Sequence, residues 1–123
     1  MSDTYTVVNP ATEQAVADVQ MADLAAVDAA IDRAAAALPA WRAITPGERA
    51  TLLRRFASVV DAHVEELAEL EVRNSGHTWG NAVWEAGNVR DVLNYYSASP
   101  ERLTGHQIPV GGGVDITFHE PLG

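Results

Sequence analysis

Three consecutive glycines, Gly111-Gly112-Gly113, are the first candidate for chemistry, because a glycine-rich loop can wrap around a phosphate group. Such a loop needs a strand before it and a helix N-terminus after it, so that backbone N–H groups and the helix dipole face the anion. Here the glycines are followed by residues 114–118, VDITF, which alternate as a strand does. The run therefore predicts the turn of a β-hairpin instead of a phosphate-binding loop.

Histidines could bind a metal or transfer protons, but their spacing argues against both roles. No two histidines have the separation of metal ligands on one helix or hairpin, and the sequence has no HExxH motif. The adjacent pair His119-Glu120 could act as acid and base, yet neighbours on a strand point to opposite faces. We expect no metal site and no shared catalytic site among the four histidines, which are His63, His77, His106 and His119.

No side chain has the context of a catalytic nucleophile. The chain contains no cysteine, no lysine for a Schiff base and no G-x-S-x-G motif. The remaining polar and aromatic candidates are best explained as surface and packing residues: Ser58, Ser75, Ser97, Ser99, Glu65, Glu66, Glu69, Glu71, Trp41, Trp79, Trp84, Tyr95 and Tyr96. The residues alone predict no catalytic, cofactor-binding or metal-binding residue.

The composition excludes several kinds of partner. The chain has 123 residues, which fits one domain, and a net charge of −9 with eight basic residues, all of them arginine. This balance argues against nucleic acid and against an acidic membrane surface, both of which need clustered basic residues. No run of about 20 apolar residues and no signal peptide is present. We therefore expect a soluble, cytoplasmic protein.

Periodicity and capping residues predict three helices and two short hairpins. Thr45-Pro46-Gly47-Glu48 is a capping box with proline at the first helical position, and Gly76 is a natural C-terminal stop. Proline at 39 should end the first helix, with Trp41 folding back onto a helix. We expect a hairpin from Thr4–Val8 and Ala15–Val19, helices over Asp23–Leu38, Thr45–Gly76 and Asn81–Ala98, and a hairpin from Gln107–Val110 and Val114–Phe118.

The large apolar residues of the second helix form a stripe that should face a core. Its members recur at helical spacing: Leu52, Phe56, Val59, Val60, Val64, Leu67 and Leu70. The opposite side carries the glutamates of residues 65–71, so this helix is clearly amphipathic.

Taken in order, several short segments resemble the N-terminal part of the aldehyde dehydrogenase superfamily. The matching pieces are residues 8–12 (VNPAT), 40–42 (AWR), Arg49 with Leu53, 74–76 (NSG), 95–98 (YYSA), 105–109 (GHQIP) and 119–123 (HEPLG). The resemblance covers nearly all of this chain and roughly the first quarter of a family member. It implies an α/β family fold, of which this chain supplies a mainly helical part.

The resemblance also implies how the chain is divided and what it lacks. Residues 1–104 would be the helical part of the cofactor-binding domain, and residues 105–123 would be a hairpin similar to the family's oligomerisation arm, ending before the Rossmann-like core. The cysteine, the glutamate and the dinucleotide-binding turn of the family would lie beyond Gly123. NAD or NADP is implied for the full-length enzyme, with none bound by this fragment. We expect an inactive fragment whose partner, the rest of the enzyme or a homologous subunit, binds through Gly105–Leu122.

Two departures from the family's pattern concern the turn regions. Glu13 stands where the family usually has glycine, and Gly76-His77-Thr78 replaces Gly-Lys-Pro. Some members hold a structural cation near the Asn9 turn, but Asn74 replaces the acidic residue expected there, so we predict no cation site.

An alternative hypothesis is a free-standing interaction module that binds a full-length relative or a complementary chain. A fragment should expose a large apolar patch and an unpaired strand edge, whereas an independent module should be a well-behaved monomer.

Overall fold

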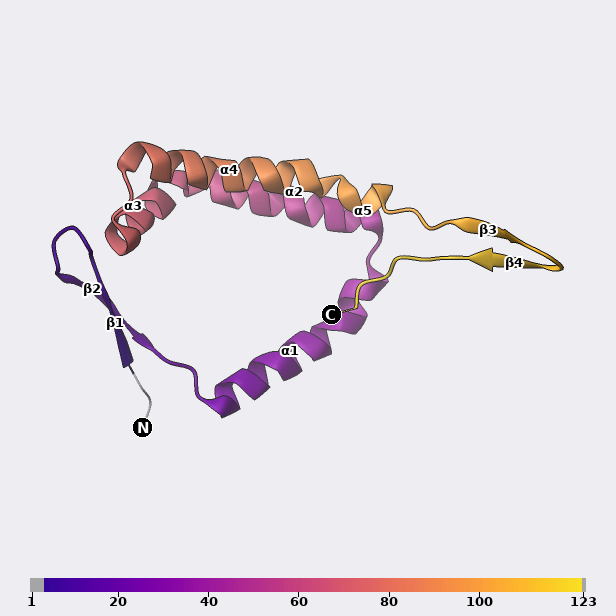
Figure 1. Cartoon of the computed structure of the whole chain (residues 1–123), viewed down its shortest axis with the longest axis horizontal. Helices are drawn as coiled ribbons and strands as arrows, with labels where there is room; N and C mark the ends of the chain where they lie inside the picture. Colours follow the sequence, from indigo (N-terminus) through magenta and orange to yellow (C-terminus); the bar gives the residue numbers. More distant parts are fainter. Residues whose placement is uncertain (1–3, 123) are drawn as a thin grey trace.

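A computed structural model describes residues 4–122 of the chain (Figure 1). The elements follow in the order β1 (Thr4–Val8), β2 (Ala15–Gln20), α1 (Leu24–Ala43), α2 (Pro46–Ala62), α3 (Val64–Ser75), α4 (Trp79–Ser97), α5 (Ser99–Arg102), β3 (Gln107–Val110) and β4 (Gly113–Ile116). The prediction of three helices is wrong: the described residues form four long helices and the four-residue α5.

The packed centre of the chain is the contact of α2 and α3 with α4 (Figure 1). Its buried apolar residues are mostly alanines, with Ala50, Ala57 and Val60 on α2, Ala68 on α3, and Ala82 and Ala86 on α4. Small side chains let the helix backbones approach closely, but each buries little apolar surface. No side chain larger than these is fully buried within the described residues.

The long helix predicted for residues 45–76 is divided at His63, which is a correction to the sequence prediction. His63 has φ −123° and ψ 18°, outside the helical region. Its backbone N–H donates to the Val60 carbonyl at 3.0 Å, while its ring Nδ1 lies 2.8 Å from the Val59 carbonyl oxygen. The ring thus occupies the carbonyl that a continuous helix would bond, and α3 begins anew at Val64.

An ion pair fastens the end of α2 to α4. The Arg90 guanidinium lies 2.8 Å from Asp61 on α2 and 2.8 Å from the adjacent Asp91. The hydrogen bond from Arg90 lowers the pKa of Asp91, and these carboxylates raise the pKa of Arg90 above its usual range. Because the folded-state pKa of Asp91 is lowered, its contribution to stability is present at neutral pH and is lost as the pH falls through that pKa.

The first helix continues through Pro39 to Ala43, so the prediction that Pro39 ends it is wrong. Proline removes one backbone hydrogen bond, but the last turn has outside support. Arg49 Nη2 donates to the carbonyls of Trp41 and Arg42, at 3.3 and 3.4 Å, and its guanidinium lies 5.6 Å from the Trp41 ring centroid. Trp41 therefore contacts α2 as expected, although from within the helix.

The predicted helix caps are confirmed. Thr45 Oγ1 accepts the Glu48 N–H at 3.2 Å, and the Glu48 carboxylate accepts the Thr45 N–H at 2.6 Å. These hydrogen bonds from Thr45, first from its backbone and then from its hydroxyl, lower the pKa of Glu48. Gly76 ends α3 with φ 73°, and a Cβ there would lie 2.8 Å from Pro10 Cγ. The turn of the first hairpin therefore rests against the end of α3.

Both predicted hairpins are present. In the first, β1 and β2 pair antiparallel, and Asn9 Oδ1 accepts the Ala11 N–H at 2.8 Å in the turn. In the second, β3 and β4 pair antiparallel around Gly112, whose φ is 76°, so the glycine run is a hairpin turn. The second strand ends at Ile116 and not at Phe118 as predicted, because the Thr117 hydroxyl, instead of a backbone carbonyl, accepts the His106 N–H.

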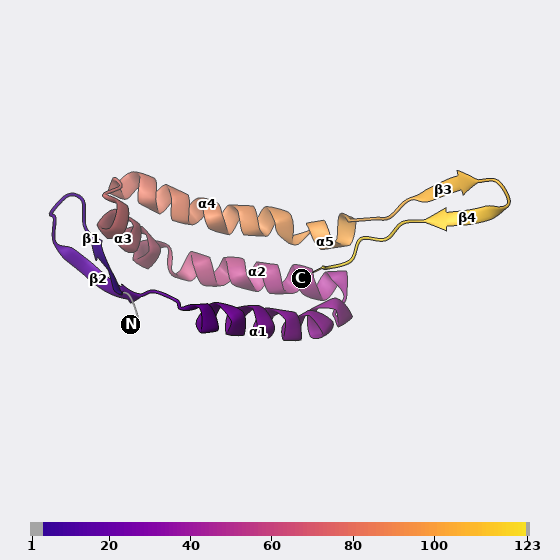
Figure 2. The same cartoon turned by 60° about the horizontal axis from the view of Figure 1, so that its bottom comes forward.

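The chain exposes far more surface than a compact protein of its size. Its accessible surface is 9463 Å². A compact monomer of 13.2 kDa exposes about 6,400 Å², so the excess is about 3,000 Å². The extensive contacts lie within the group of helices α2, α3, α4 and α5 and between the two strands of each hairpin. Helix α1 makes no contact of comparable extent with the other described elements. Figure 2 shows the second hairpin projecting beyond α5, away from the helices.

No helix formed by residues 4–122 is both long and apolar enough to cross a membrane.

The turn of the first hairpin contains a strained residue that gives a direct test. Glu13 has φ 60°, which lies in the left-handed region that favours glycine. We expect Glu13→Gly to stabilise the hairpin by about 0.7 kcal/mol, since relief of the strain exceeds the entropy that glycine adds to the unfolded chain. Amide exchange in β1 and β2 should then slow by about threefold. Glu13→Ala keeps the strain, so equal slowing in both variants would contradict this account.

Candidate functional site

The four histidines lie in four separate places. His63 is at the α2–α3 junction, His77 at the α3–α4 junction, His106 at the base of the second hairpin, and His119 after β4. Within residues 4–122, no three His, Asp or Glu side chains are grouped so that they could hold a metal ion.

The pair His119-Glu120 lies in an irregular segment, so the argument that places the two side chains on opposite faces of a strand does not apply. Both residues line the same hollow, of about 250 Å³, between the start of α2 and Pro100. The Glu120 carboxylate forms an ion pair with Arg42 at the end of α1. This pair joins residues 78 positions apart and returns the C-terminal segment to α1. Its carboxylate is therefore engaged in a structural contact.

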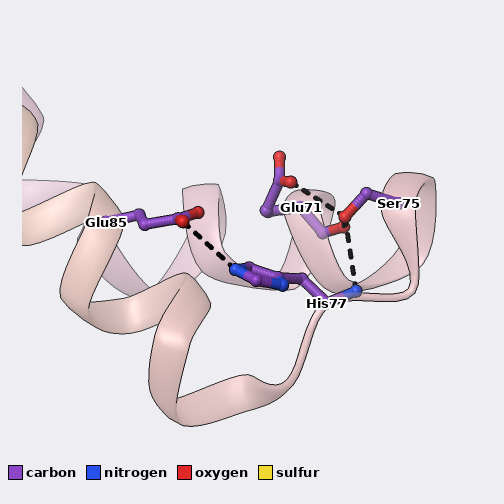
Figure 3. Close-up of polar contacts among 4 residues, drawn as sticks. All are labelled: Glu71, Ser75, His77 and Glu85. Carbon is purple, nitrogen blue, oxygen red and sulfur yellow. Dashed lines mark hydrogen bonds and ion pairs between the residues drawn. The ribbon is translucent and has the colours of Figure 1, made fainter.

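A cluster of Ser, His and Glu side chains at the α3–α4 junction has the residue types of a catalytic triad but not its contacts (Figure 3). Ser75 Oγ donates to the Glu71 backbone carbonyl and lies 2.8 Å from Glu71 Oε1. The His77 ring contacts Glu85 at 3.1 Å, and only the His77 backbone N–H reaches Ser75 Oγ. Without an imidazole on the hydroxyl, Ser75 is not activated as a nucleophile. The cluster closes the turn between the two helices.

An apolar groove of about 480 Å³ begins beside this cluster. It is lined by residues of three helices: Phe56, Val60, Leu67, Glu71, Ala82, Glu85, Ala86 and Val89. Phe56, Leu67 and Val89 remain exposed there, by 55%, 40% and 49%. The sequence identified Phe56 and Leu67 as members of an apolar stripe, but these two side chains are exposed in this chain, whereas Val60 of the same stripe is buried. The groove itself was missed, since it depends on how α3 turns away from α2.

The second hairpin is another exposed apolar feature. Ile108 and Val110 on β3 and Val114 and Ile116 on β4 are all exposed. Its base is closed by Thr117 N–H, which donates to the His106 carbonyl at 2.9 Å, and by His106 N–H on Thr117 Oγ1 at 2.8 Å. Gly105 lies so close to this base that a Cβ would be 1.7 Å from the Thr117 carbonyl oxygen. Glycine is therefore required for the hairpin to leave the helices in this direction.

Comparison with known proteins identifies the family to which this open helical layer with its projecting hairpin belongs. The sequence matches the Aldehyde dehydrogenase family over residues 1–123, and the chain belongs to that family. A betaine aldehyde dehydrogenase of Cereibacter sphaeroides is 35% identical over 120 residues, which are 95% of this chain and 24% of the relative. The chain thus spans about a quarter of the length of the curated relatives it matches.

Solved structures give the same result. A NAD-dependent benzaldehyde dehydrogenase from Corynebacterium glutamicum superposes with a TM-score of 0.84 at 28% identity, covering 89% of this chain and 24% of the other. A putative aldehyde dehydrogenase from Burkholderia cenocepacia gives 0.85 at 33% identity, covering 90% and 23%. The structure of PnpE in complex with nicotinamide adenine dinucleotide gives 0.85 at 31% identity, with the same coverage. The chain therefore has the fold of the corresponding part of these aldehyde dehydrogenase structures.

The close contact of Gly105 gives the second testable prediction. In Gly105→Ala the methyl group must push the Thr117 carbonyl away, which separates the strands at the base of the hairpin. We expect the Thr117 amide to exchange at least tenfold faster, measured by NMR, because its hydrogen bond to His106 is lost. Gly111→Ala is the control, since nothing lies within 4 Å of its Cβ position. Unchanged exchange at Thr117 in Gly105→Ala would show that the close contact is not required.

Proposed function

We propose that this chain is the N-terminal segment of an NAD(P)-dependent aldehyde dehydrogenase and supplies structure, not chemistry. The main support for this proposal is that the family match extends over residues 1–123, while the aligned residues span only 24% of the length of the betaine aldehyde dehydrogenase relative. In the complete enzyme an aldehyde would be oxidised to a carboxylic acid by a cysteine nucleophile and a nicotinamide cofactor. This chain contains no cysteine, so the nucleophile must come from other polypeptide.

The exposed surface supports a segment that is covered in its complete form. An excess of about 3,000 Å² is more than one partner buries in a standard protein–protein interface, about 800 Å². Much of it belongs to large side chains that helical periodicity places on one face, such as Leu24 on α1, which is 84% exposed. Covering such faces would provide the hydrophobic stabilisation that the alanine-rich centre lacks.

The chain's partner, in this proposal, is the rest of the enzyme or a homologous subunit, bound through Gly105–Leu122. The projecting hairpin offers two short strands with exposed apolar side chains and unpaired outer edges, which favour pairing with another strand. The same hairpin favours the second candidate, a free-standing module that binds a full-length relative. In both cases the nicotinamide cofactor is bound by the partner and not by this chain.

The relatives act on unlike aldehydes, such as betaine aldehyde and benzaldehyde. The proposed reaction is therefore the oxidation of an aldehyde, with no particular aldehyde assigned.

The third prediction concerns activity. The purified chain should not reduce NAD⁺ or NADP⁺ with any aldehyde, because its described residues include no activated nucleophile and its sequence has no cysteine. The measurement is absorbance of the reduced cofactor at 340 nm, against a sample without protein and against an intact aldehyde dehydrogenase. Turnover above the protein-free control that survives repurification would refute the proposed role.

A further inference from the structure

The groove between α2, α3 and α4 combines an apolar floor with two carboxylates. Its base is made of Val60, Ala82 and Ala86, which are buried, and its walls include the exposed side chains of Phe56 and Val89. Glu71 on α3 and Glu85 on α4 line the same groove. Figure 3 shows these two side chains with their polar contacts.

The two carboxylates are held in place by their neighbours. Ser75 Oγ lies 2.8 Å from Glu71 Oε1, and the His77 ring lies 3.1 Å from Glu85 Oε1. Each contact uses one oxygen, which leaves the other free to accept a further hydrogen bond. A cationic side chain arriving in the groove would therefore meet two negative groups that are already oriented, and little side-chain entropy would be lost.

Charge excludes a second copy of this chain as the preferred occupant. The chain has a net charge of −9 and no lysine, so a second copy would bring mainly negative charge to this acidic groove. Helix α1, which packs little against the other helices, has an apolar stripe that includes Leu24 and Ile31. Asp28 interrupts this stripe, because it lies four residues after Leu24 and three before Ile31 and so shares their face of the helix. Docking this stripe would bring a third carboxylate to Glu71 and Glu85.

The shape of the groove favours a helix over a strand. All three of its walls are helices, whose backbone groups are bonded internally and offer no edge for strand pairing. An amphipathic helix can instead lay apolar side chains at i, i+3 or i+4, and i+7 along such a groove.

We propose that this groove binds a basic amphipathic helix from the rest of an aldehyde dehydrogenase polypeptide, with a Lys or Arg that pairs with Glu71 and Glu85. The inference rests on the proposed function and deepens it, because it names the surface through which the helices receive their partner and the chemistry that the partner must present.

The test measures affinity for the Cereibacter sphaeroides betaine aldehyde dehydrogenase polypeptide without the part that corresponds to this chain. For the double variant Glu71→Gln/Glu85→Gln we expect at least about tenfold weaker binding in 150 mM salt, because the incoming cation would be desolvated without a counter-charge. The control Glu65→Gln/Glu66→Gln removes the same number of charges, both from α3 and outside the groove, and should bind within about twofold of the original chain. Helical content by circular dichroism should be equal in all three proteins.

Hydrogen exchange then locates the binding surface. Binding should protect amides in residues 56–60 and 82–89 from exchange. Raising the salt from 50 to 500 mM should lower the binding affinity of the original chain more than that of Glu71→Gln/Glu85→Gln. If the original chain does not bind at all, the proposed function fails. If it binds but the two double variants weaken equally, or neither weakens, the groove is not the docking site and the inference is overturned.

Discussion

The close approach of α2 and α4 through alanine is the contact on which the rest of this structure depends. Ala50 and Ala57 on α2 and Ala82 and Ala86 on α4 are buried where the helices pack, so the helices lie near each other while many of their larger side chains remain exposed. A seam of small residues fixes geometry well but contributes little hydrophobic free energy, since each methyl group buries only a small area. The large apolar residues therefore remain available for other polypeptide, and the excess surface of the chain follows from this arrangement.

The peripheral elements are tied to this centre by a few specific contacts. Arg49 holds the last turn of α1, Arg42 pairs with Glu120, and Pro10 rests on Gly76. Each contact fixes a direction: that of α1, of the segment after β4, and of the first hairpin. None of them buries much apolar surface, and exposed ion pairs contribute about 1 kcal/mol or less. These contacts consequently fix the orientations of the peripheral elements, while the stability of the chain depends on what covers its exposed apolar faces.

Local chemistry made part of this structure predictable from the sequence. The capping box at Thr45, the glycine stop at residue 76 and the turn at Gly111–Gly113 depend on neighbouring residues, and all three are confirmed. The predictions that failed depend on distant contacts or on a choice between equivalent bonds. Arg49 bonds to carbonyl groups of the last turn of α1 and so supports the helix beyond Pro39. The His63 ring contacts the Val59 carbonyl, which the His63 backbone N–H would bond in a continuous helix. The groove depends on that break and on the α3–α4 turn, so no periodicity in one helix could reveal it. Periodicity did identify the apolar stripes, but it cannot say whether the surface they face belongs to the same chain.

The most direct test of the account is the state of the purified chain alone. Sedimentation velocity over a range of concentrations, together with thermal unfolding followed by circular dichroism, reports whether the exposed apolar surface is a stable surface of a complete protein. The account predicts concentration-dependent association and a broad transition, because the bare helical faces and strand edges seek partners and the alanine seam stabilises the centre only weakly. A sharp monomer at all concentrations with a cooperative transition would contradict it and would favour an independent module.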